Sequence, residues 1–508
     1  MPPGIKQLDP QNQAQRTAKQ IVRPLMQRTS RQWETARRMS PRKGANSKYP
    51  SWKSYTRKKS REVKYVYFLH LHDSEVARLF AETLAPYVKK ENCELPLHAL
   101  PSGITFSQIQ HRLETQRILY LLLDNDEQSK LQASLLLKSL PERLRRRVRS
   151  ILLLKEGEVA PANRQTVEHA LGIPLSHILR PQKSDLNIPR GSQLLNVRQA
   201  SQYRRIAREI AGTRLGLVLS SGGAKGFAYI GVLKVLEQLG LEFDVIAGSS
   251  VGAVIAALWA KGYDANQLTD HANKFRKWMH LRRLFDHVMD IRKGLLKGNR
   301  LEKYLRKLLK DANFTDLSTP LVVTATDVVN LRSVLINDGD VASALHASIA
   351  IPGICIPCQR EGETFIDGGV SNPLPVHTLR QMGIENILAV STVFRAVHGY
   401  EMRQHREHAE LSEKASSPLR HKINARLNLF ANGNAFDILM RSFETAHGRM
   451  VEPEIAMADL VIEPHPPDSR WQEFLQPDKY LQAGLQSAEE HTAALKQLEV
   501  SRKKGMQL

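Results

Sequence analysis

The sequence predicts an α/β protein with two domains behind a basic N-terminal arm, and three observations support this fold class. Short apolar runs alternate with helical stretches over residues 63–180, as in sheets whose strands are joined by helices. The same alternation returns in residues 212–498, where glycine-rich turns join strand to helix. The hydrophobic share of 42% and the charged share of 24% are ordinary for a globular protein, which excludes wholesale disorder.

The arm, residues 1–62, holds most of the excess charge. Residues 1–64 carry 17 Lys and Arg against Asp9, Glu34 and Glu62, so that +14 of the net charge of +22 lies here. Few apolar residues interrupt the segment, and we expect it to be mostly disordered. A solvated arm without a partner and an arm attracted to anionic membrane are both open, whereas nucleic acid is disfavoured because no nucleic-acid-binding motif accompanies the charge. An Arg-rich, acid-poor composition is also compatible with a cleaved organelle-targeting sequence.

The first domain, residues 63–180, reads as a small parallel α/β domain. Helical patterns at residues 74–90 and 127–140 separate three apolar strand candidates, which are residues 63–71, 117–124 and 147–157. We assign this domain no chemistry, because it has neither a glycine-rich phosphate loop nor a metal-ligand cluster. His70 and His72 alternate along a strand, for which a structural role is the expectation. Residues 181–211 read as a linker and a lead-in helix.

The second domain contains the informative turns. Its strand candidates are residues 215–220, 243–248, 320–328, 332–338, 386–391 and 459–464. Its helix candidates are residues 226–240, 251–262, 341–349, 373–382 and 480–497. Residues 397–435 form a polar stretch that reads as a loop insertion and a lid or membrane-contact candidate, because loops of this length are uncommon without a task.

Residues 248–252, Gly-Ser-Ser-Val-Gly, fit Gly-x-Ser-x-Gly between a strand and a helix. In that context a sharp turn projects the central serine out of the backbone, and the flanking glycines remove side chains that would clash. The register selects Ser250 as the nucleophile. The N-terminus of the following helix lowers the cost of developing negative charge there.

Residues 221–226, Ser-Gly-Gly-Ala-Lys-Gly, also join a strand to a helix. Their backbone N–H groups can face one anionic point, so the loop can hold a phosphate or an oxyanion. The phosphate reading is weak, because neither the Walker pattern nor the dinucleotide fingerprint is present. We therefore predict an oxyanion hole from Gly222, Gly223 and Ala224, with Lys225 either near an anionic headgroup or in solvent.

Asp367, followed by Gly368 and Gly369, stands after a short strand candidate. An acid flanked by glycines at a strand end can approach a serine closely. An ordinary aspartate, with a pKa of about 3.9, is a poor base at neutral pH. Held against a serine hydroxyl in a dry site, however, it can accept the proton as the bond to carbon forms.

In this order, the three elements resemble the patatin-like phospholipase family, whose pattern is Gly-Gly-x-Arg/Lys-Gly, then Gly-x-Ser-x-Gly, then Asp-Gly-Gly/Ala. Residues 344–353, ALHASIAIPG, are similar to the family's Ala-Ser-x-Ala-x-Pro segment. Residues 205–226, with a short α/β segment ahead of them, look most like the neuropathy target esterase branch. The resemblance implies a three-layer α/β/α fold without metal or organic cofactor. It also implies a dyad, Ser250 and Asp367, that hydrolyses acyl esters of phospholipids or lysophospholipids through an acyl-enzyme.

Two departures from the family pattern matter. The family loop commonly has glycines where this chain has Ser220 and Ser221, which puts the fit of the acyl chain in doubt. The cyclic-nucleotide-binding domains of the branch's larger members have no counterpart in this sequence. A membrane-visiting hydrolase of this kind would be cytoplasmic and peripherally associated with membranes. We expect no transmembrane helix, because no apolar run approaches the roughly 18 residues that one needs.

Several alternatives remain open at this point. His377 follows Asp367 in the order of an α/β-hydrolase triad, although it falls inside a predicted helix. A catalytically silent lipid- or nucleic-acid-binding scaffold on the same fold is the alternative outside enzymes. Cys355 and Cys358 could be read as redox or zinc chemistry, but one pair supplies only half of the usual ligands, so we expect buried cysteines. With Cys93 they make three, too few for a disulfide framework, which points to a reducing compartment.

Overall fold

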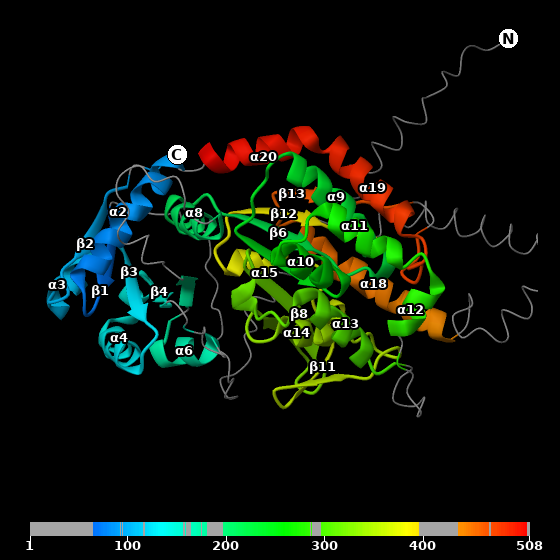
Figure 1. Ribbon diagram of the computed structural model, residues 1–508, viewed down its shortest axis with the longest axis horizontal. Helices are drawn as coiled ribbons and strands as arrows, with labels where there is room; N and C mark the ends of the chain where they lie inside the picture. The colour runs from blue at the N-terminus through cyan, green and yellow to red at the C-terminus, as the bar shows by residue number, and fades with distance from the viewer. Residues whose placement is uncertain are drawn as a thin grey trace, which may run out of the picture. The chain divides into compact units, whose positions relative to one another are not determined.

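A computed structural model of the chain describes residues 65–504 (Figure 1). Its longer gaps are residues 180–196, 287–295 and 396–434, and its short ones are 92, 94, 115–116, 156–157, 159–163, 174, 285 and 467–468. The basic arm and almost all of the predicted insertion therefore lie outside the described residues. Among the helices in the described ranges, none combines the length and the apolar character that a membrane crossing requires.

The first domain is built on a five-stranded sheet in the order β2-β1-β3-β4-β5, and every neighbouring pair is parallel. The strands are β1 (Tyr65–His70), β2 (Leu97–Leu100), β3 (Arg117–Asp124), β4 (Val148–Leu153) and β5 (Leu175–Leu179). The helices are α2 (Ser74–Lys90), α3 (Phe106–Glu114), α4 (Glu127–Ser139), α5 (Glu142–Arg145), α6 (Arg164–Leu171) and α8 (Val197–Ala211). This confirms the predicted small parallel α/β domain.

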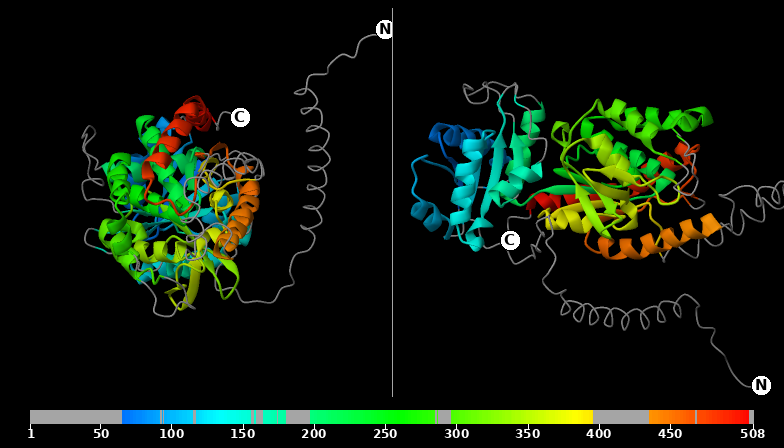
Figure 2. Two further views of the ribbon diagram at one scale, coloured as in Figure 1. Left: turned by 90° about the vertical axis from the view of Figure 1, so that its right-hand side faces the viewer. Right: turned by 90° about the horizontal axis from the view of Figure 1, so that it is seen from below.

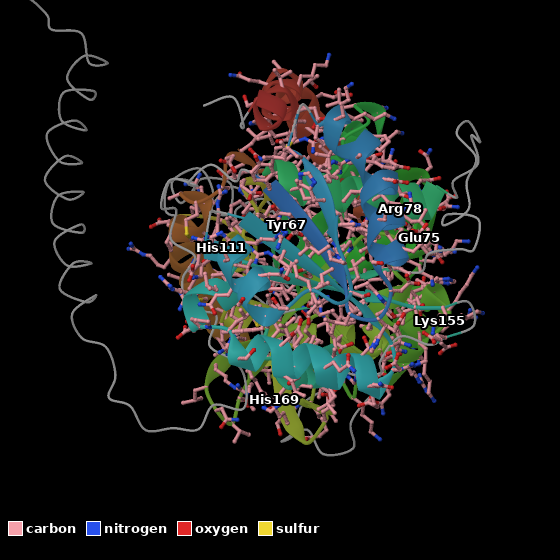
Figure 3. All side chains as sticks on the ribbon, turned by 90° about the vertical axis from the view of Figure 1, so that its left-hand side faces the viewer. Tyr67, Glu75, Arg78, His111, Lys155 and His169 are labelled. Atoms are coloured by element: carbon pink, nitrogen blue, oxygen red, sulfur yellow. The ribbon has the colours of Figure 1, made fainter. Side chains whose placement is uncertain are left out.

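Both faces of the first sheet are covered, which explains why its strands are apolar throughout. One core holds Leu121 of β3 with residues of α3, α4 and α6, and the other holds Phe68 of β1 with residues of α2 and α8. The outward side of α2 is polar, and Figure 3 shows Glu75 and Arg78 together on its surface, where they form an ion pair.

The second domain contains an eight-stranded mixed sheet in the order β10-β11-β8-β7-β6-β12-β13, with β9 paired to β8. Its strands are β6 (Leu215–Leu219), β7 (Val245–Ser249), β8 (Leu321–Asp327), β9 (Arg332–Ile336), β10 (Cys358–Arg360), β11 (Glu363–Asp367), β12 (Asn386–Val390) and β13 (Leu460–Ile462). The five strands from β8 to β13 in this order run parallel, while β9, β10 and β11 join antiparallel. The carboxyl ends of β6 and β7 are therefore neighbours.

Helices cover both faces of this sheet, so the domain has three layers, as predicted. One face packs mainly against α9 (Phe227–Gln238), α10 (Val251–Lys261), α11 (Ala265–Lys274), α13 (Asn299–Leu309), α14 (Val341–Ser348), α19 (Pro477–Glu490) and α20 (Thr492–Lys504). The other face packs against α15 (Val376–Gln381) and α18 (Ala435–Ile455). Figure 2 shows α18, in orange, on the side of the sheet away from the green helices.

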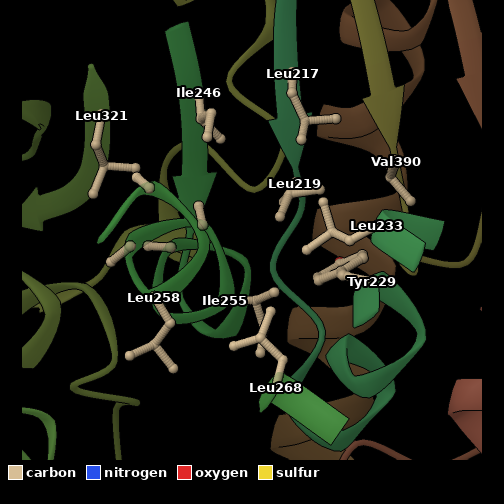
Figure 4. Packing of buried hydrophobic residues seen from close by; sticks show 14 of the residues in the cluster. Leu217, Leu219, Tyr229, Leu233, Ile246, Ile255, Leu258, Leu268, Leu321 and Val390 are labelled. Atoms are coloured by element: carbon tan, nitrogen blue, oxygen red, sulfur yellow. The ribbon is translucent and has the colours of Figure 1, made fainter. Parts of the chain in front are cut away.

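The large core lies beneath α9 and α10 and fixes where these helices begin. Leu217, Leu219 and Ile246 project from the strands onto Ile255 of α10 and its neighbours (Figure 4). Because α10 starts directly after β7 and α9 starts after the short glycine loop that follows β6, this packing holds both N-termini at one edge of the sheet.

Several helices differ from the sequence prediction, which did not include α3, α5, α6, α11 or α13. The single helix predicted at residues 480–497 is two, α19 and α20, with a break at His491, the C-cap of α19. Pattern reasoning missed α18 altogether, because it carries Pro453 and has no strong amphipathic pattern.

Candidate active site

The sharp turn around Ser250 lies between β7 and α10. Ser250 has φ 52° and ψ −125°, a left-handed region that a residue other than glycine rarely adopts. A Cβ on Gly248 would lie 2.6 Å from the backbone nitrogen of Ala253, and one on Gly252 would lie 2.4 Å from the carbonyl oxygen of Ser220. Both glycines are therefore required by close backbone approach. The turn gives Ser250 the backbone geometry of a nucleophile elbow.

Ser250 and Asp367 meet although 117 residues separate them. The Ser250 hydroxyl donates to Oδ2 of Asp367 at 2.6 Å, and Oδ1 of the same carboxylate accepts the backbone N–H of Gly369 at 2.7 Å. The sheet brings them together, because β7 and β11 both pair with β8, where Ser249 lies opposite Thr324 and Asp367 lies opposite Ala325. Burial raises the pKa of Asp367 to about 6, against the opposing effect of both hydrogen bonds. The carboxylate is thus a stronger base than an ordinary aspartate and is in contact with the nucleophile.

The backbone N–H groups of the glycine loop have two different roles: one makes a hydrogen bond within the fold, and two remain available to the site. Ala224 donates its N–H to the carbonyl oxygen of Trp471 at 2.7 Å, which takes this group away from the predicted oxyanion hole. In the described chain, Gly222 and Gly223 donate to no backbone carbonyl. A Cβ on Gly222 would lie 2.2 Å from Oγ1 of Thr392, so only glycine fits at this position. Gly222 and Gly223 remain as oxyanion-hole candidates, and Ala224 is removed from the set.

Ser220 and Ser221, the departures from the family's glycines, have different surroundings. The hydroxyl of Ser220 lies 2.8 Å from that of Tyr229, and it accepts the backbone N–H of Thr392 at 3.1 Å. The hydroxyl of Ser221 is buried and makes no hydrogen bond within the described residues. It lies close to Gly369, on which a Cβ would come within 3.0 Å of it. Ser220 therefore braces the loop, while Ser221 lines it beside the turn that follows Asp367.

Lys225 is not in solvent. Its side chain is buried, with Nζ 3.4 Å from Oε1 of Glu444 on α18 and 4.6 Å from the centre of the Phe394 ring. Both contacts stabilise the ammonium group away from water. The headgroup role of Lys225 stays a prediction, and in this structure its partner is a carboxylate of α18.

Sequence reasoning gave Ser348 no role. Its hydroxyl accepts the backbone N–H of Ser250 at 2.9 Å and so fixes the peptide that carries the nucleophile. The available signal in the sequence is its place in the ALHASIAIPG stretch, which resembles a segment of the patatin-like family. A residue 98 positions away cannot be assigned this contact from local pattern.

The remaining candidates lie outside the dyad's hydrogen bonds. His377 is exposed, and its imidazole contacts the side chain of Gln381 at 2.7 Å, so the structure does not bring it to Ser250. Asp327, at the end of β8, accepts hydrogen bonds from Asn330 and Arg332 and has a structural role. Cys355 and Cys358 are free thiols whose pKa burial raises to about 11.

The described ranges contain no group of three or more His, Cys, Asp or Glu side chains placed to hold a metal ion. His70, for example, pairs with Asp124 at 3.2 Å and accepts the backbone N–H of Asp73.

The arrangement of Ser250, Asp367 and the glycine loop can support attack by a serine hydroxyl, assisted by a buried carboxylate, with backbone donors beside it.

Residues 217–380 match the family described as patatin-like phospholipase, so this part of the chain is similar to a patatin-like phospholipase domain. Some of the relatives are named for neuropathy target esterase or for the NTE family. The relatives also include "Patatin-like phospholipase domain-containing protein 6" of Mus musculus, 30% identical over 195 residues, which are 37% of this chain and 14% of that protein. "Lysophospholipase NTE1" of Cryptococcus neoformans is 28% identical over 191 residues, 37% of this chain and 12% of that protein.

A smaller relative, "Uncharacterized NTE family protein Mb1092c" of Mycobacterium bovis, is 32% identical over 190 residues, 36% of this chain and 50% of that protein. The matches thus span from about an eighth to half of the relatives' length. Among solved structures, VipD from Legionella pneumophila covers 57% of this chain and 67% of its own, with 16% identity and a TM-score of 0.30.

Proposed function

We propose that this protein is a serine esterase that hydrolyses acyl ester bonds of phospholipids or lysophospholipids. The observation that carries the proposal is the hydrogen bond of 2.6 Å from Ser250 to the buried carboxylate of Asp367. The patatin-like match and the lysophospholipase among the relatives support the class of substrate.

In the first half-reaction, Oγ of Ser250 attacks the acyl carbonyl carbon while its proton passes to Oδ2 of Asp367. The negative charge on the carbonyl oxygen is met by the N–H groups of Gly222 and Gly223. Collapse of the tetrahedral intermediate breaks the ester bond, and the departing alkoxide takes the proton from Asp367. An acyl-Ser250 ester remains.

In the second half-reaction, water attacks the acyl-enzyme. Asp367, ionised again, accepts a proton from the water, and the same backbone donors stabilise the second oxyanion. Collapse releases the fatty acid and returns the proton to Ser250. Because Asp367 is buried, its proton is exchanged with the serine or the water and little with bulk solvent. One carboxylate thereby acts as base and acid in turn.

The test is acyl release by the full-length wild type and by Ser250→Ala from lysophospholipids, diacyl phospholipids and monoacylglycerols. We expect release by the wild type only, with the substrate panel identifying the preferred lipid. A fluorophosphonate probe should label the wild type at Ser250. Acyl release that persists in Ser250→Ala would refute the mechanism, and a wild type that takes no label would favour a silent scaffold.

A separate part of the proposal concerns the arm, residues 1–62, which lies outside the described residues. Its charge makes it suited to anionic lipid. Deleting it should weaken binding to anionic vesicles, more at low salt than at high salt, and spare turnover of a soluble ester. Unchanged vesicle binding would contradict a role at membranes.

A further inference from the structure

Exposed apolar side chains lie on two separate segments, each close in sequence to a phenylalanine that contacts Phe227. On α12 (Trp278–Leu284), Trp278 and Met279 are 54% and 58% exposed, and Leu475, in the segment before α19, is 42% exposed. Large apolar side chains exposed close together mark surfaces that meet a protein, a membrane or a ligand. We refer to Trp278, Met279 and Leu475 as the apolar rim.

Aromatic contacts connect the two segments that carry the apolar rim to Phe227, next to the glycine loop. The ring centres of Phe275 and Phe474 lie 5.9 Å and 6.3 Å from that of Phe227. Phe227 follows the glycine loop directly, and the carbonyl of Trp471 holds the Ala224 N–H of that loop. Both segments of the rim are therefore attached to the loop that carries the candidate oxyanion donors. Figure 1 shows α12 and the red segment that leads into α19 at the same end of the second domain.

The surroundings of the rim on α12 are basic. Residues 271–285 include no Asp or Glu. Their exposed basic side chains are Lys274, Arg276, Lys277, Arg282 and Arg283, of which Arg276 pairs with Asp478. Leu281 is buried and anchors α12 to the domain. An exposed tryptophan and methionine among Lys and Arg is the composition of an element that lies in the headgroup region of an anionic bilayer.

We propose that the apolar rim and the basic side chains of α12 dock this protein on an anionic lipid surface, with the glycine loop facing the lipid. Trp278 and Met279 enter the boundary between headgroups and acyl chains, while Lys277, Arg282 and Arg283 contact lipid phosphates. The inference rests on the proposed function, since a bilayer ester must reach Ser250 from the surface that the rim contacts. It assigns docking to the catalytic domain, in addition to any contribution from the arm.

The primary measurement is binding to sedimented vesicles of phosphatidylcholine with and without phosphatidylglycerol. All proteins carry Ser250→Ala in the full-length chain, so that lipid is not consumed. Trp278→Ala/Met279→Ala should weaken binding to the anionic vesicles about tenfold, because two interfacial side chains are lost. High salt screens the arm and should leave this difference in place. Lys277→Gln/Arg282→Gln should weaken binding only where anionic lipid is present.

The matched control is Leu131→Ala/Leu135→Ala, which removes two side chains of α4 that are 62% and 61% exposed. This variant should bind vesicles as the parent does. We call Trp278→Ala/Met279→Ala the rim variant. When the rim variant keeps Ser250, it should also lower the ratio of turnover on vesicle lipid to turnover on a soluble ester. Thermal unfolding of each variant reports on its fold.

Vesicle binding of the rim variant equal to that of the parent would overturn the docking surface while leaving the esterase untouched. A changed oligomeric state with unchanged vesicle binding would assign the rim to a protein interface and would overturn it as well. If the wild type hydrolysed no lipid ester but the rim variant still lost vesicle binding, the proposed function would fail and the docking surface would stand.

Discussion

The two α/β domains use the same β-turn-α unit in opposite ways. In the first domain, aspartates cap the helices that follow β1 and β3: Asp73 accepts the backbone N–H of Glu75 at 2.8 Å, and Asp126 accepts that of Ser129 at 2.6 Å. In the second domain, neither Gly226 ahead of α9 nor Ser250 ahead of α10 makes a side-chain cap.

This difference decides which sheet edge can do chemistry. A capped helix satisfies its first N–H groups internally, whereas an uncapped one leaves them for another negative charge. In the first domain, aspartate side chains accept the N–H groups at the two helix starts. In the second domain, the corresponding edge of the sheet holds a strained serine, a buried carboxylate and glycine N–H groups without a backbone acceptor among the described residues. We therefore predict that substitutions at the carboxyl edge of the second domain's sheet alter turnover, and that substitutions at the carboxyl edge of the first domain's sheet alter stability.

The largest effect is expected at the dyad. Asp367→Asn keeps the shape of the side chain but cannot accept the proton of Ser250, so kcat/KM should fall by about a thousandfold or more. Hydrolysis of a soluble ester measures this, with Ser250→Ala as the reference for complete loss. A loss below tenfold in Asp367→Asn would mean that another group is the base.

The pH dependence comes next. The pKa of Asp367 is raised from 3.8 to about 6, so the carboxylate is the active base above pH 6 and is protonated below it. Activity should therefore be present at neutral pH, and kcat/KM should fall about tenfold per unit below pH 6. A profile of kcat/KM on a soluble ester tests this. A flat profile down to pH 4.5 would contradict the raised pKa.

A histidine base would give a similar profile, so His377 needs its own test. The His377 side chain is exposed and contacts Gln381, and its backbone N–H is accepted by Glu454 of α18. His377→Ala should thus keep at least about a tenth of the esterase activity and the same pH profile. Gln381→Ala, which removes the imidazole's partner, is the matched control. Near-total loss in His377→Ala alone would restore the triad.

Local pattern predicted the parts of the site, and tertiary contact assembled them. The strand–turn–helix context identified Ser250 and the glycine loop, because their constraints lie within a few residues. The pairing of Ser250 with Asp367 came only from a family resemblance, since spacing along the chain says nothing of which strands flank β8. The engagement of Ala224 by Trp471 was not predictable, because the loop's free N–H groups depend on a distant carbonyl.

Lys225 shows the same limit on the sequence prediction. A lysine in a glycine-rich turn suggests exposure, but Lys225 is buried and pairs with Glu444 of α18. No local signal predicted α18, so the partner and the burial of Lys225 were both missed. Alternation of apolar strands and helices was sufficient to predict the parallel sheet of the first domain, although β2 and β5 were not predicted individually.

The smallest effect on turnover, and the clearest effect on stability, is expected at the carboxyl edge of the first domain's sheet. Asp126→Ala removes the cap of α4 and should lower the free energy of unfolding by about 1 kcal/mol, while esterase activity stays within twofold. Asp126→Asn keeps an acceptor at this position and should restore most of the stability. Denaturant titration and a soluble-ester assay measure the two quantities.

At the carboxyl edge of the second domain's sheet, we expect a substitution with the opposite effects on turnover and stability. Ser250 is the N-cap of α10 but makes no cap hydrogen bond, and its φ of 52° is strained for any residue with a Cβ. Ser250→Gly should therefore abolish turnover yet raise the free energy of unfolding by up to about 1 kcal/mol, because glycine adopts this backbone without strain. If Ser250→Gly destabilised the chain as much as Asp126→Ala does, the hydroxyl of Ser250 would have a structural role and the two edges would not differ in the way proposed.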